Sequence, residues 1–597
     1  MTVTDPFAHL HDEAYGAPLA ARRATAETLF NPYGRAGQSL DGTWRLTLDP
    51  FEEGLRQRWW ADDDRSSSEW ETPRDWEWGA GEPAPVPGCW NLLRPELLHY
   101  EGGAWYVRDF ETVQVVPGEA ALLHFGAAAY RAEVFLNGVH LGGHLGASTP
   151  FSLDATSALR PGRNRLMVFV ENARRAERVP MHHFDWFNYG GLHRSVVLYR
   201  VPALHVRRFA LHLGGEPGRP HLVLRAVLSQ PLDGAARLVV PALGLDAAVL
   251  VRGGVAEAVI QASPPLWSPE EPRLIDVELH FGAEVLRDRI GFRHLATDGT
   301  RILLNGRDLV LCGACVHEDD LASGRVTDEA DIRRRIADLR ALGGNFLRLS
   351  HYPHDPRVAQ LCDEAGVLLW SEVPVYWAIG FDDPGTLADA TNQLREVILR
   401  DANRASIILW GVGNENADTD ARLAFMAHLA AVARAADPSR LVSAACLINR
   451  ETFRIEDRLA SHLDVIGLNE YFGWYETGTE GLRRLLVNSA PDRPVVISET
   501  GADALSGLRG GNAALFTEER QAAFFEAQFA ALSEADFVRG IAVWLLYDFR
   551  SLRRQARPQG GFNRKGLIAE DKVTRKQSFQ AVAEGLTAFR TSRSACP

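Results

Sequence analysis

The sequence predicts a multidomain protein in which two β-sandwich domains precede a (β/α)8 barrel. At 597 residues the chain is too long for one hydrophobic core and should divide into roughly three or four domains. Up to about residue 293, short β-branched and aromatic runs alternate with Gly, Pro and Asn turns, which is typical of all-β domains. From about residue 300, short apolar strands alternate with amphipathic helices. This alternation favours a barrel over the alternative, a doubly wound sheet.

Residues 1–200 are predicted to form the first β-sandwich. The segment AEVFLNGVHLGGHLG predicts two strands joined by an Asn-Gly turn, the residue pair that suits a tight hairpin. The segment RPGRNRLMVFVEN repeats the pattern of a turn followed by a strand. We expect residues 1–36 to be a poorly structured lead-in to this domain.

Residues 201–293 are predicted to form a second sandwich of immunoglobulin-like length, and residues 294–597 the barrel. In the barrel region, TDEADIRRRIADLRALGG places Ile332, Ile336 and Leu339 at helical spacing, and Gly343 follows as a helix stop. The strand NFLRLS comes next. Repeated strand–helix units of this kind extend over about 300 residues of the chain.

The charge and the cysteine pattern exclude several classes of protein. A formal net charge of −13 at pH 7 argues against nucleic acid or an anionic membrane as a partner. No apolar stretch approaches the roughly 18 residues of a membrane helix, and the N-terminal residues lack the pattern of a signal peptide. The six cysteines are scattered, and the CxxC pair Cys312 and Cys315 fits a strand better than a metal or redox site. We therefore expect a cytoplasmic protein.

Acidic side chains follow several predicted barrel strands. Active sites of such barrels form at the C-terminal ends of the strands, where one finds Glu318, Glu372, Glu415, Glu470 and Glu499. Glycoside hydrolysis needs two carboxyl groups, one protonated to donate to the leaving oxygen and one ionised. Spacing alone predicts an enzyme with acidic site residues but does not select two of the five.

Motifs along the whole chain resemble one enzyme family. They are LDGTW, FDWFNYGGLHRSVVLY, LWSPEEPRL, LRLSHYP, ILWGVGNEN, GLNEYFGWY, VVISETGAD and GFNRKG, in that order. The chain resembles the glycoside hydrolases of family 2 and, within them, is most similar to β-glucuronidases. The resemblance implies a jelly-roll sugar-binding-like domain, an immunoglobulin-like β-sandwich and a catalytic (β/α)8 TIM barrel.

The resemblance also implies roles for individual residues. Glu415 matches the general acid/base and Glu499 the nucleophile of a retaining, double-displacement mechanism. Around them, Asn414 matches the residue that holds the sugar 2-hydroxyl, and Tyr471 the residue that orients the nucleophile. The remaining matches in this part of the site are His351 for sugar hydroxyls, Trp544 under the sugar ring and Asp185 from the first domain.

A scarce residue type marks the other end of the expected site. Lysine occurs only at positions 565, 572 and 576, and Lys565 follows Asn563 in GFNRKG. Both residues match the Asn-x-Lys pair that binds the C6 carboxylate of a uronic acid. Tyr475 and Asn469 are expected near that carboxylate, and Arg557 is a candidate for a second cation.

These matches imply an exo-acting β-glucuronidase that releases terminal β-linked glucuronic acid from a small conjugate or an oligosaccharide. The alternatives are a β-galacturonidase, a neutral-sugar enzyme such as a β-galactosidase, and a non-catalytic carbohydrate-binding protein. We expect no metal and no cofactor, because ADTD after GNEN lacks a metal-binding histidine spacing and no nucleotide-binding glycine loop appears. The family also implies a homo-oligomer. Asn416 and Thr500 depart from the family pattern, and the segment 378–392 is short.

Overall fold

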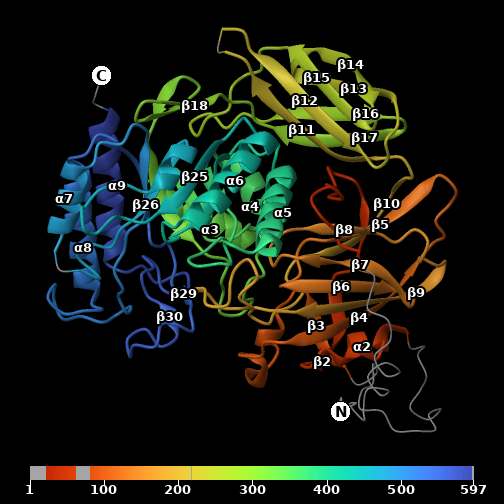
Figure 1. The fold of residues 1–597 in the computed structure, drawn as a ribbon, viewed down its shortest axis with the longest axis horizontal. Helices are drawn as coiled ribbons and strands as arrows, with labels where there is room; N and C mark the ends of the chain where they lie inside the picture. Colours follow the sequence, from red (N-terminus) through yellow and green to blue (C-terminus); the bar gives the residue numbers. More distant parts are fainter. Residues whose placement is uncertain (1–21, 62–80, 217, 477, 595–597) are drawn as a thin grey trace, which may run out of the picture.

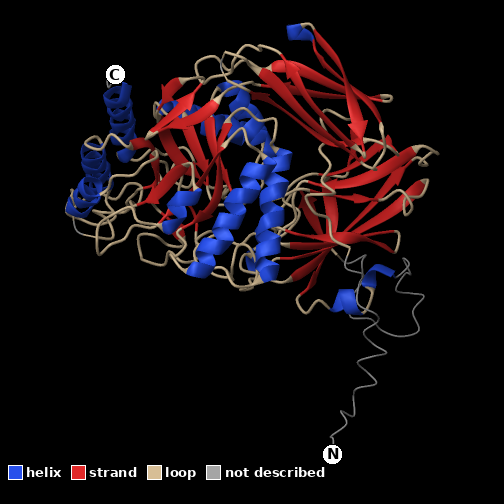
Figure 2. Ribbon diagram, turned by 45° about the horizontal axis from the view of Figure 1, so that its top comes forward, coloured by secondary structure: helices blue, strands red, loops and turns tan. Residues whose placement is uncertain are grey.

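The computed structural model describes residues 22–61, 81–216, 218–476 and 478–594. Figure 1 shows three bodies, with the two all-β domains beside one flank of the barrel. Figure 2 shows that the helices gather around the barrel strands, whereas the other two domains consist almost wholly of strands and loops. The predicted combination of two β-sandwich domains and a barrel is confirmed. The domain limits at residues 200 and 293 and the jelly-roll topology stay our proposals.

Two antiparallel sheets form the first domain. The six-stranded sheet has the order β3-β2-β4-β9-β6-β7, and the four-stranded sheet the order β1-β10-β5-β8. Apolar faces of both sheets enclose a core that includes Trp44, Tyr106 and Phe125. The strands are β1 (Gly37–Ser39), β2 (Gly42–Asp49), β3 (Glu82–Val86), β4 (Gly103–Thr112), β5 (Glu119–Phe125), β6 (Arg131–Leu136), β7 (Val139–Leu145), β8 (Phe151–Asp154), β9 (Gly162–Glu171) and β10 (Val196–Pro202).

The second domain is built from seven antiparallel strands around a separate core. Their order is β11-β12-β15-β14-β13-β16-β17. Alternation along β12, where Leu222, Leu224 and Ala226 are buried, shows the two-residue period of a half-buried strand. The strands are β11 (Val206–Gly214), β12 (His221–Leu228), β13 (Gly234–Val240), β14 (Leu245–Arg252), β15 (Val255–Gln261), β16 (Ile275–Phe281) and β17 (Glu284–Ile290).

Eight parallel strands close the barrel, since β28 pairs with β21. A three-stranded sheet of β18 (Leu295–Asp298), β19 (Arg301–Leu304) and β20 (Arg307–Leu309) precedes it. The barrel strands are β21 (Leu311–Val316), β22 (Phe346–Leu349), β23 (Leu368–Glu372), β24 (Ile407–Asn414), β25 (Leu441–Cys446), β26 (Val465–Asn469), β27 (Val495–Glu499) and β28 (Val538–Val543). A short hairpin of β29 (Phe549–Arg550) and β30 (Phe562–Asn563) follows β28 and carries the GFNRKG segment.

Local sequence explains where the outer helices begin. Asp328, Asp355 and Asp383 cap α3, α4 and α5 with their carboxylates, and proline occupies the first turn of α4 and α5. Thr419 and Thr517 cap α6 and α8 in the same way. The helices are α2 (Glu53–Arg56) in the first domain and α3 (Glu329–Ala341), α4 (Pro356–Ala365), α5 (Pro384–Arg400), α6 (Asp420–Ala436), α7 (Glu480–Asn488), α8 (Glu518–Leu532) and α9 (Ser578–Ser594) around the barrel. Within the described ranges, no helix has both the length and the apolarity that a membrane crossing needs.

One prediction for the start of the chain is wrong for its described part. Leu29 and Phe30 are each only 1% exposed, so this stretch is packed rather than loose. Phe30 contacts the ring of Tyr199 at a centroid distance of 5.4 Å. Apolar residues in a lead-in segment can be covered by strands that come much later in the sequence, which local composition does not reveal. Residues 1–21 lie outside the described residues.

Helix α5 joins the barrel to the first domain. Gln393 donates to the Val179 carbonyl at 2.9 Å, and the buried His144 ring contacts Glu396 at 3.1 Å. Asn392 accepts from the Ala26 amide at 2.9 Å. These three contacts join the two domains through paired polar groups and fix the first domain beside the barrel.

Candidate active site

The two predicted catalytic glutamates lie at the same end of the barrel. Glu415 follows β24 directly, and Glu499 is the last residue of β27. Between these strands runs β25 and then β26, whose last residue, Asn469, donates to Glu415 Oε1 at 3.1 Å and to Asn414 Oδ1 at 3.2 Å. Parallel strands present their C-terminal ends at one mouth, so these side chains converge there.

Arg348 connects the two sides of this cluster. It is fully buried on β22, and its Nη1 donates to Glu499 Oε1 at 2.7 Å while its Nη2 donates to Asn414 Oδ1 at 2.7 Å. Its Nε and Nη2 also reach the Glu372 carboxylate at 3.1 Å. One guanidinium therefore fixes the positions of two carboxylates and of the Asn414 side chain.

Glu499 is held by two donors inside a buried environment. Burial raises the pKa of Glu499 to about 8, and the nearby charge of Glu415 adds to the rise. Arg348 and the Tyr471 hydroxyl, 2.7 Å from Oε2, act in the opposite direction because they stabilise the ionised form. Arg348 and Tyr471 thus fix the orientation of the Glu499 carboxyl group. Its raised pKa means that it can gain or lose a proton near neutral pH.

Glu415 has a partner that the sequence motifs did not indicate. The Trp377 indole Nε1 donates to Glu415 Oε2 at 2.7 Å. Both Trp377 and Glu415 adopt left-handed backbone conformations, with φ of 54° and 53°. Asn416, which departs from the family pattern, donates its side-chain amide to the Trp377 carbonyl at 2.7 Å. Asn416 thus stabilises the backbone of Trp377, the residue that orients Glu415.

Aromatic rings line the floor of the cluster. The Trp544 ring stacks on the His351 ring at a centroid distance of 5.1 Å and an angle of 17°. His351 Nδ1 lies 2.8 Å from Glu372 Oε1, and its Nε2 lies 3.7 Å from Glu499 Oε1. Burial, with Arg348 close by, lowers the pKa of His351 well below its usual value, so the imidazole is neutral. A flat apolar ring beside a neutral imidazole suits a sugar ring and its hydroxyls.

Asn563 and Lys565 lie on one rim of the barrel mouth, in and just after β30. Lys565 is 1% exposed, and its Nζ donates to Asp503 Oδ2 at 2.5 Å and to the Tyr475 hydroxyl at 2.9 Å. The Asn563 side chain is fully buried; its oxygen accepts from the Lys565 amide, and its Nδ2 has no hydrogen-bond partner among the described residues. Burial alone would raise the pKa of Asp503, but the Lys565 charge holds it below its usual value.

The second cation at this rim is Arg554. Arg554 Nη1 donates to the Tyr475 hydroxyl at 3.1 Å, on which Lys565 also converges, and its Nη2 pairs with Asp185 of the first domain. Ser551 also donates to Asp185. Arg557, the candidate named from the sequence, is exposed. The loop after β29 therefore brings Arg554, and not Arg557, to the rim beside Lys565.

Of the other strand-end glutamates, only Glu372 joins this cluster, through Arg348 and His351. Glu318 forms a buried ion pair with Arg194 of the first domain at 3.1 Å. Glu470 accepts from the Phe472 amide at 3.1 Å, and burial raises its pKa to about 7. Glu318 and Glu470 are therefore structural rather than candidate catalytic residues.

Four further residues of the site were not found from the sequence, namely Arg348, Trp377, Asp503 and Arg554. Of the four, only Arg348 could have been recognised from the sequence. It is a charged residue inside the apolar strand NFLRLS, and a buried charge requires a partner nearby. In the part of the chain that the structure describes, no group of three or more His, Cys, Asp or Glu side chains could hold a metal ion. Cys312 and Cys315 are buried in β21.

Comparisons with known proteins identify the family of the chain. The family models described as "Glycosyl hydrolases family 2, sugar binding domain" and "TIM barrel domain" match residues 38–202 and 295–587. The β-glucuronidase of Paenibacillus borealis is 28% identical, over 92% of this chain and 96% of its own length. That of Rattus norvegicus is 27% identical, over 90% and 89%.

Solved structures extend the likeness to three dimensions. The β-glucuronidase from Ruminococcus gnavus in complex with D-glucuronic acid has a TM-score of 0.81 at 26% identity, covering 94% of this chain and 100% of that chain. Its complex with C6-substituted uronic isofagomine gives 0.82 at 25%. Both family domains match in their expected order, and two glutamates meet at the C-terminal mouth of the barrel. The chain is therefore a glycoside hydrolase and belongs to glycosyl hydrolase family 2.

Proposed function

We propose that this enzyme is a retaining exo-β-glucuronidase that cleaves terminal β-linked glucuronic acid from a conjugate or an oligosaccharide. The observation that carries the proposal is the buried ammonium of Lys565, two residues after Asn563, at the mouth that holds Glu415 and Glu499. The Asn563 amide nitrogen has no hydrogen-bond partner among the described residues. An ammonium and an amide donor from one short segment suit a sugar carboxylate and offer little to a neutral hydroxymethyl group.

The donors needed for the carboxylate are available despite the existing contacts. A lysine ammonium has three N–H groups, and two of those of Lys565 point to Asp503 and to Tyr475. The third N–H and Asn563 Nδ2 can both donate to the substrate. Asp503 and Asp185 orient Lys565 and Arg554, so the two cations need little rearrangement when the carboxylate binds.

The first chemical step uses the proton shared by the buried pair. Burial raises the pKa of Glu499 to about 8, so this carboxyl holds a proton at neutral pH before the substrate binds. In the reactive form that proton lies on Glu415, as the double displacement requires, and Arg348 and the Tyr471 hydroxyl stabilise the ionised Glu499 that attacks. Glu415 then protonates the glycosidic oxygen while a Glu499 oxygen attacks the anomeric carbon, and the alcohol leaves.

The second step regenerates the enzyme. Ionised Glu415 removes a proton from water, which attacks the anomeric carbon and displaces Glu499, so the β-configuration is kept. Trp377 and Asn469 keep the Glu415 carboxylate in one position through both steps. Asn414 Nδ2 has no hydrogen-bond partner among the described residues, and we assign it to the sugar 2-hydroxyl. Trp544 lies under the ring.

The test is a panel of p-nitrophenyl β-glycosides that contains the glucuronide, galacturonide, glucoside and galactoside, with Glu499→Gln as the inactive control. We expect glucuronide to be preferred, and ¹H NMR of the first product to show the β-anomer. Preference for a neutral sugar would contradict the role of Lys565. Preference for the galacturonide would leave the role of Lys565 in binding the carboxylate intact and change only the proposed configuration of the sugar at C4. An α-anomer as the first product would contradict a retaining mechanism.

A further inference from the structure

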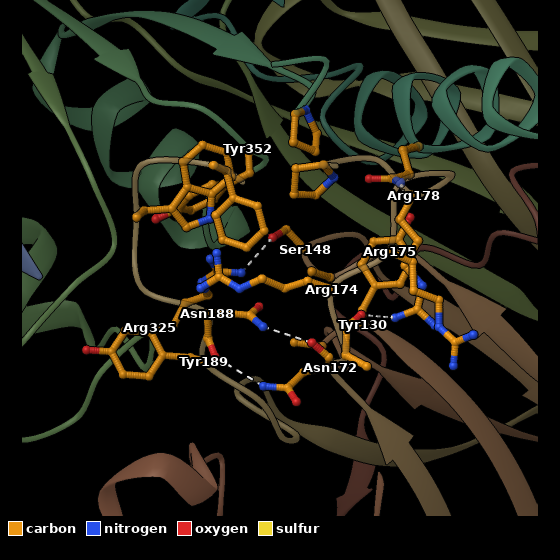
Figure 3. A pocket seen from close by; sticks show the side chains of 18 residues that line it. Tyr130, Ser148, Asn172, Arg174, Arg175, Arg178, Asn188, Tyr189, Arg325 and Tyr352 are labelled. Carbon is orange, nitrogen blue, oxygen red and sulfur yellow. Dashed lines mark hydrogen bonds between the residues drawn. The ribbon is translucent and has the colours of Figure 1, made fainter. Parts of the chain in front are cut away.

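A cavity lies between the first domain and the barrel, and neither Glu415 nor Glu499 lines it. Its volume is about 30 Å³, two to three times the roughly 10–15 Å³ that one water needs. The described residues that line it include four arginines and no acidic residue, in a protein whose net charge is −13. Figure 3 shows labelled arginine side chains gathered around this space with Ser148 among them.

Three of these arginines already have carboxylate partners outside the cavity. Arg174 pairs with Glu101, Arg175 with Glu52 and Arg178 with Glu171. Their charges are thus compensated within the first domain. The fourth, Arg325, comes from the barrel, from the segment between β21 and α3.

Arg325 differs from the other three. It is 5% exposed and forms no ion pair with any carboxylate in the described ranges, and its Nε has no hydrogen-bond partner there. Its Nη1 makes only a long contact, 3.5 Å, with the Ser148 hydroxyl, drawn as a dashed line in Figure 3. Its guanidinium carbon lies 4.3 Å from the centre of the Tyr352 ring. The face of a ring compensates a buried charge only partly, whereas an anion does so fully.

The other polar groups in the wall are fixed by each other. Asn172 and Asn188 exchange hydrogen bonds between side-chain amides and backbone carbonyls at 3.1 and 2.8 Å. The Tyr189 hydroxyl donates to Asp319. The Arg325 guanidinium and the Ser148 hydroxyl, one from each domain, have no such fixed partners among the described residues and can both donate to a bound species.

We propose that this cavity binds a small inorganic anion of halide size, held by Arg325 of the barrel and Ser148 of the first domain. The anion neutralises the buried guanidinium and ties the two domains together. Trp186, which also lines the cavity, packs on the His351 ring at a centroid distance of 5.8 Å. The anion would therefore stabilise the position of Trp186, which packs on His351 of the candidate active site.

Bromide is the probe, because it has the charge of chloride and scatters anomalously. A crystal of the full-length protein soaked in sodium bromide is expected to show an anomalous peak between Arg325 and Ser148. Bromide peaks elsewhere on the protein with none in this cavity would overturn the proposal, and so would a water there in well-defined density.

Thermal unfolding at constant ionic strength gives an independent readout. Raising chloride from 5 to 300 mM against gluconate, which is too large for the cavity, should raise the apparent Tm by roughly 2 °C. Arg325→Gln and, separately, Ser148→Ala should weaken or abolish this increase. Arg333→Gln, which removes an exposed arginine of α3, should keep it. An equal chloride response in wild type, Arg325→Gln and Ser148→Ala would contradict the site.

Discussion

Lys565 and Asp503 form a buried ion pair at the rim of the barrel mouth, with Nζ 2.5 Å from Oδ2 and both side chains 1% exposed. The pair explains how a lysine can be held in the interior, because the Asp503 carboxylate compensates its charge. It also means that removing the lysine has two effects, since the substrate loses a cation and Asp503 loses its partner.

Lys565→Met should lower kcat/KM for a β-glucuronide by about 10²-fold or more, because a desolvated carboxylate would lose its charged donor. Activity on the matching glucoside should change far less. The double variant Asp503→Asn, Lys565→Met removes both charges, so it should recover the Tm lost in the single variant without recovering glucuronide hydrolysis. Near-normal glucuronide kinetics in either variant would show that Lys565 does not bind the sugar carboxylate.

The two glutamates should respond differently to the leaving group. Glu415→Ala removes the acid, so hydrolysis of a poor leaving group should fall by about 10²–10⁴-fold, while an activated dinitrophenyl glycoside should still release its phenol in a rapid first step. Azide should then accelerate turnover and yield a β-glycosyl azide. Glu499→Ala should be inactive on both substrates and should give no such product. The assignment fails if the two variants show the same pattern.

Arg554 and Arg557 provide a matched pair of arginines in one loop. Arg554→Met should raise KM for glucuronides about tenfold or more, since it removes the guanidinium that converges with Lys565 on Tyr475. Arg557→Met changes charge by the same amount at an exposed position and should leave kcat and KM within about twofold of wild type. Steady-state kinetics at fixed ionic strength compare the two directly. A larger loss at Arg557 would reverse our choice.

The raised pKa of Glu499 predicts a pH-dependent stability cost. Between its ordinary value of 4.5 and about 8, the folded carboxyl binds a proton that the unfolded chain does not, so the free energy of unfolding falls as pH rises through this window. Glu499→Gln mimics the neutral form and should remove a cost of up to a few kcal/mol. Its Tm should match wild type near pH 4.5 and exceed it by roughly 2–5 °C at pH 8. Glu329→Gln, exposed on α3, should show no such divergence.

Regular patterns made much of the fold predictable. The helical spacing of Ile332, Ile336 and Leu339 marked the face of α3 that is buried. Acidic residues directly after apolar strands marked the barrel mouth, because strand direction alone brings such ends together. These signals are local in the sequence, so they can be recognised without tertiary information.

The parts of the site that could not be predicted depend on distant contacts. Trp377 reaches Glu415 only through a left-handed backbone that Asn416 supports from the next strand's end. Arg554 and Arg557 are equivalent by composition, and only the loop fold and the Asp185 carboxylate distinguish them. Asp503 could have been suspected only once Lys565 was known to be buried. The residues that the sequence did not predict are therefore those whose positions depend on loop conformation or on contacts between domains.

Through the contact between Asp185 and Arg554, the first domain takes part in the proposed binding of the sugar carboxylate. A barrel inherited or expressed without that domain would keep both glutamates, but Arg554 would lose its anchor. Under the proposed function, exchanging the first domain for that of a relative should therefore change the binding of the sugar carboxylate, even when no residue of the barrel changes. The proposed carboxylate site therefore depends on both domains, which also share apolar packing through Phe184 and Trp186.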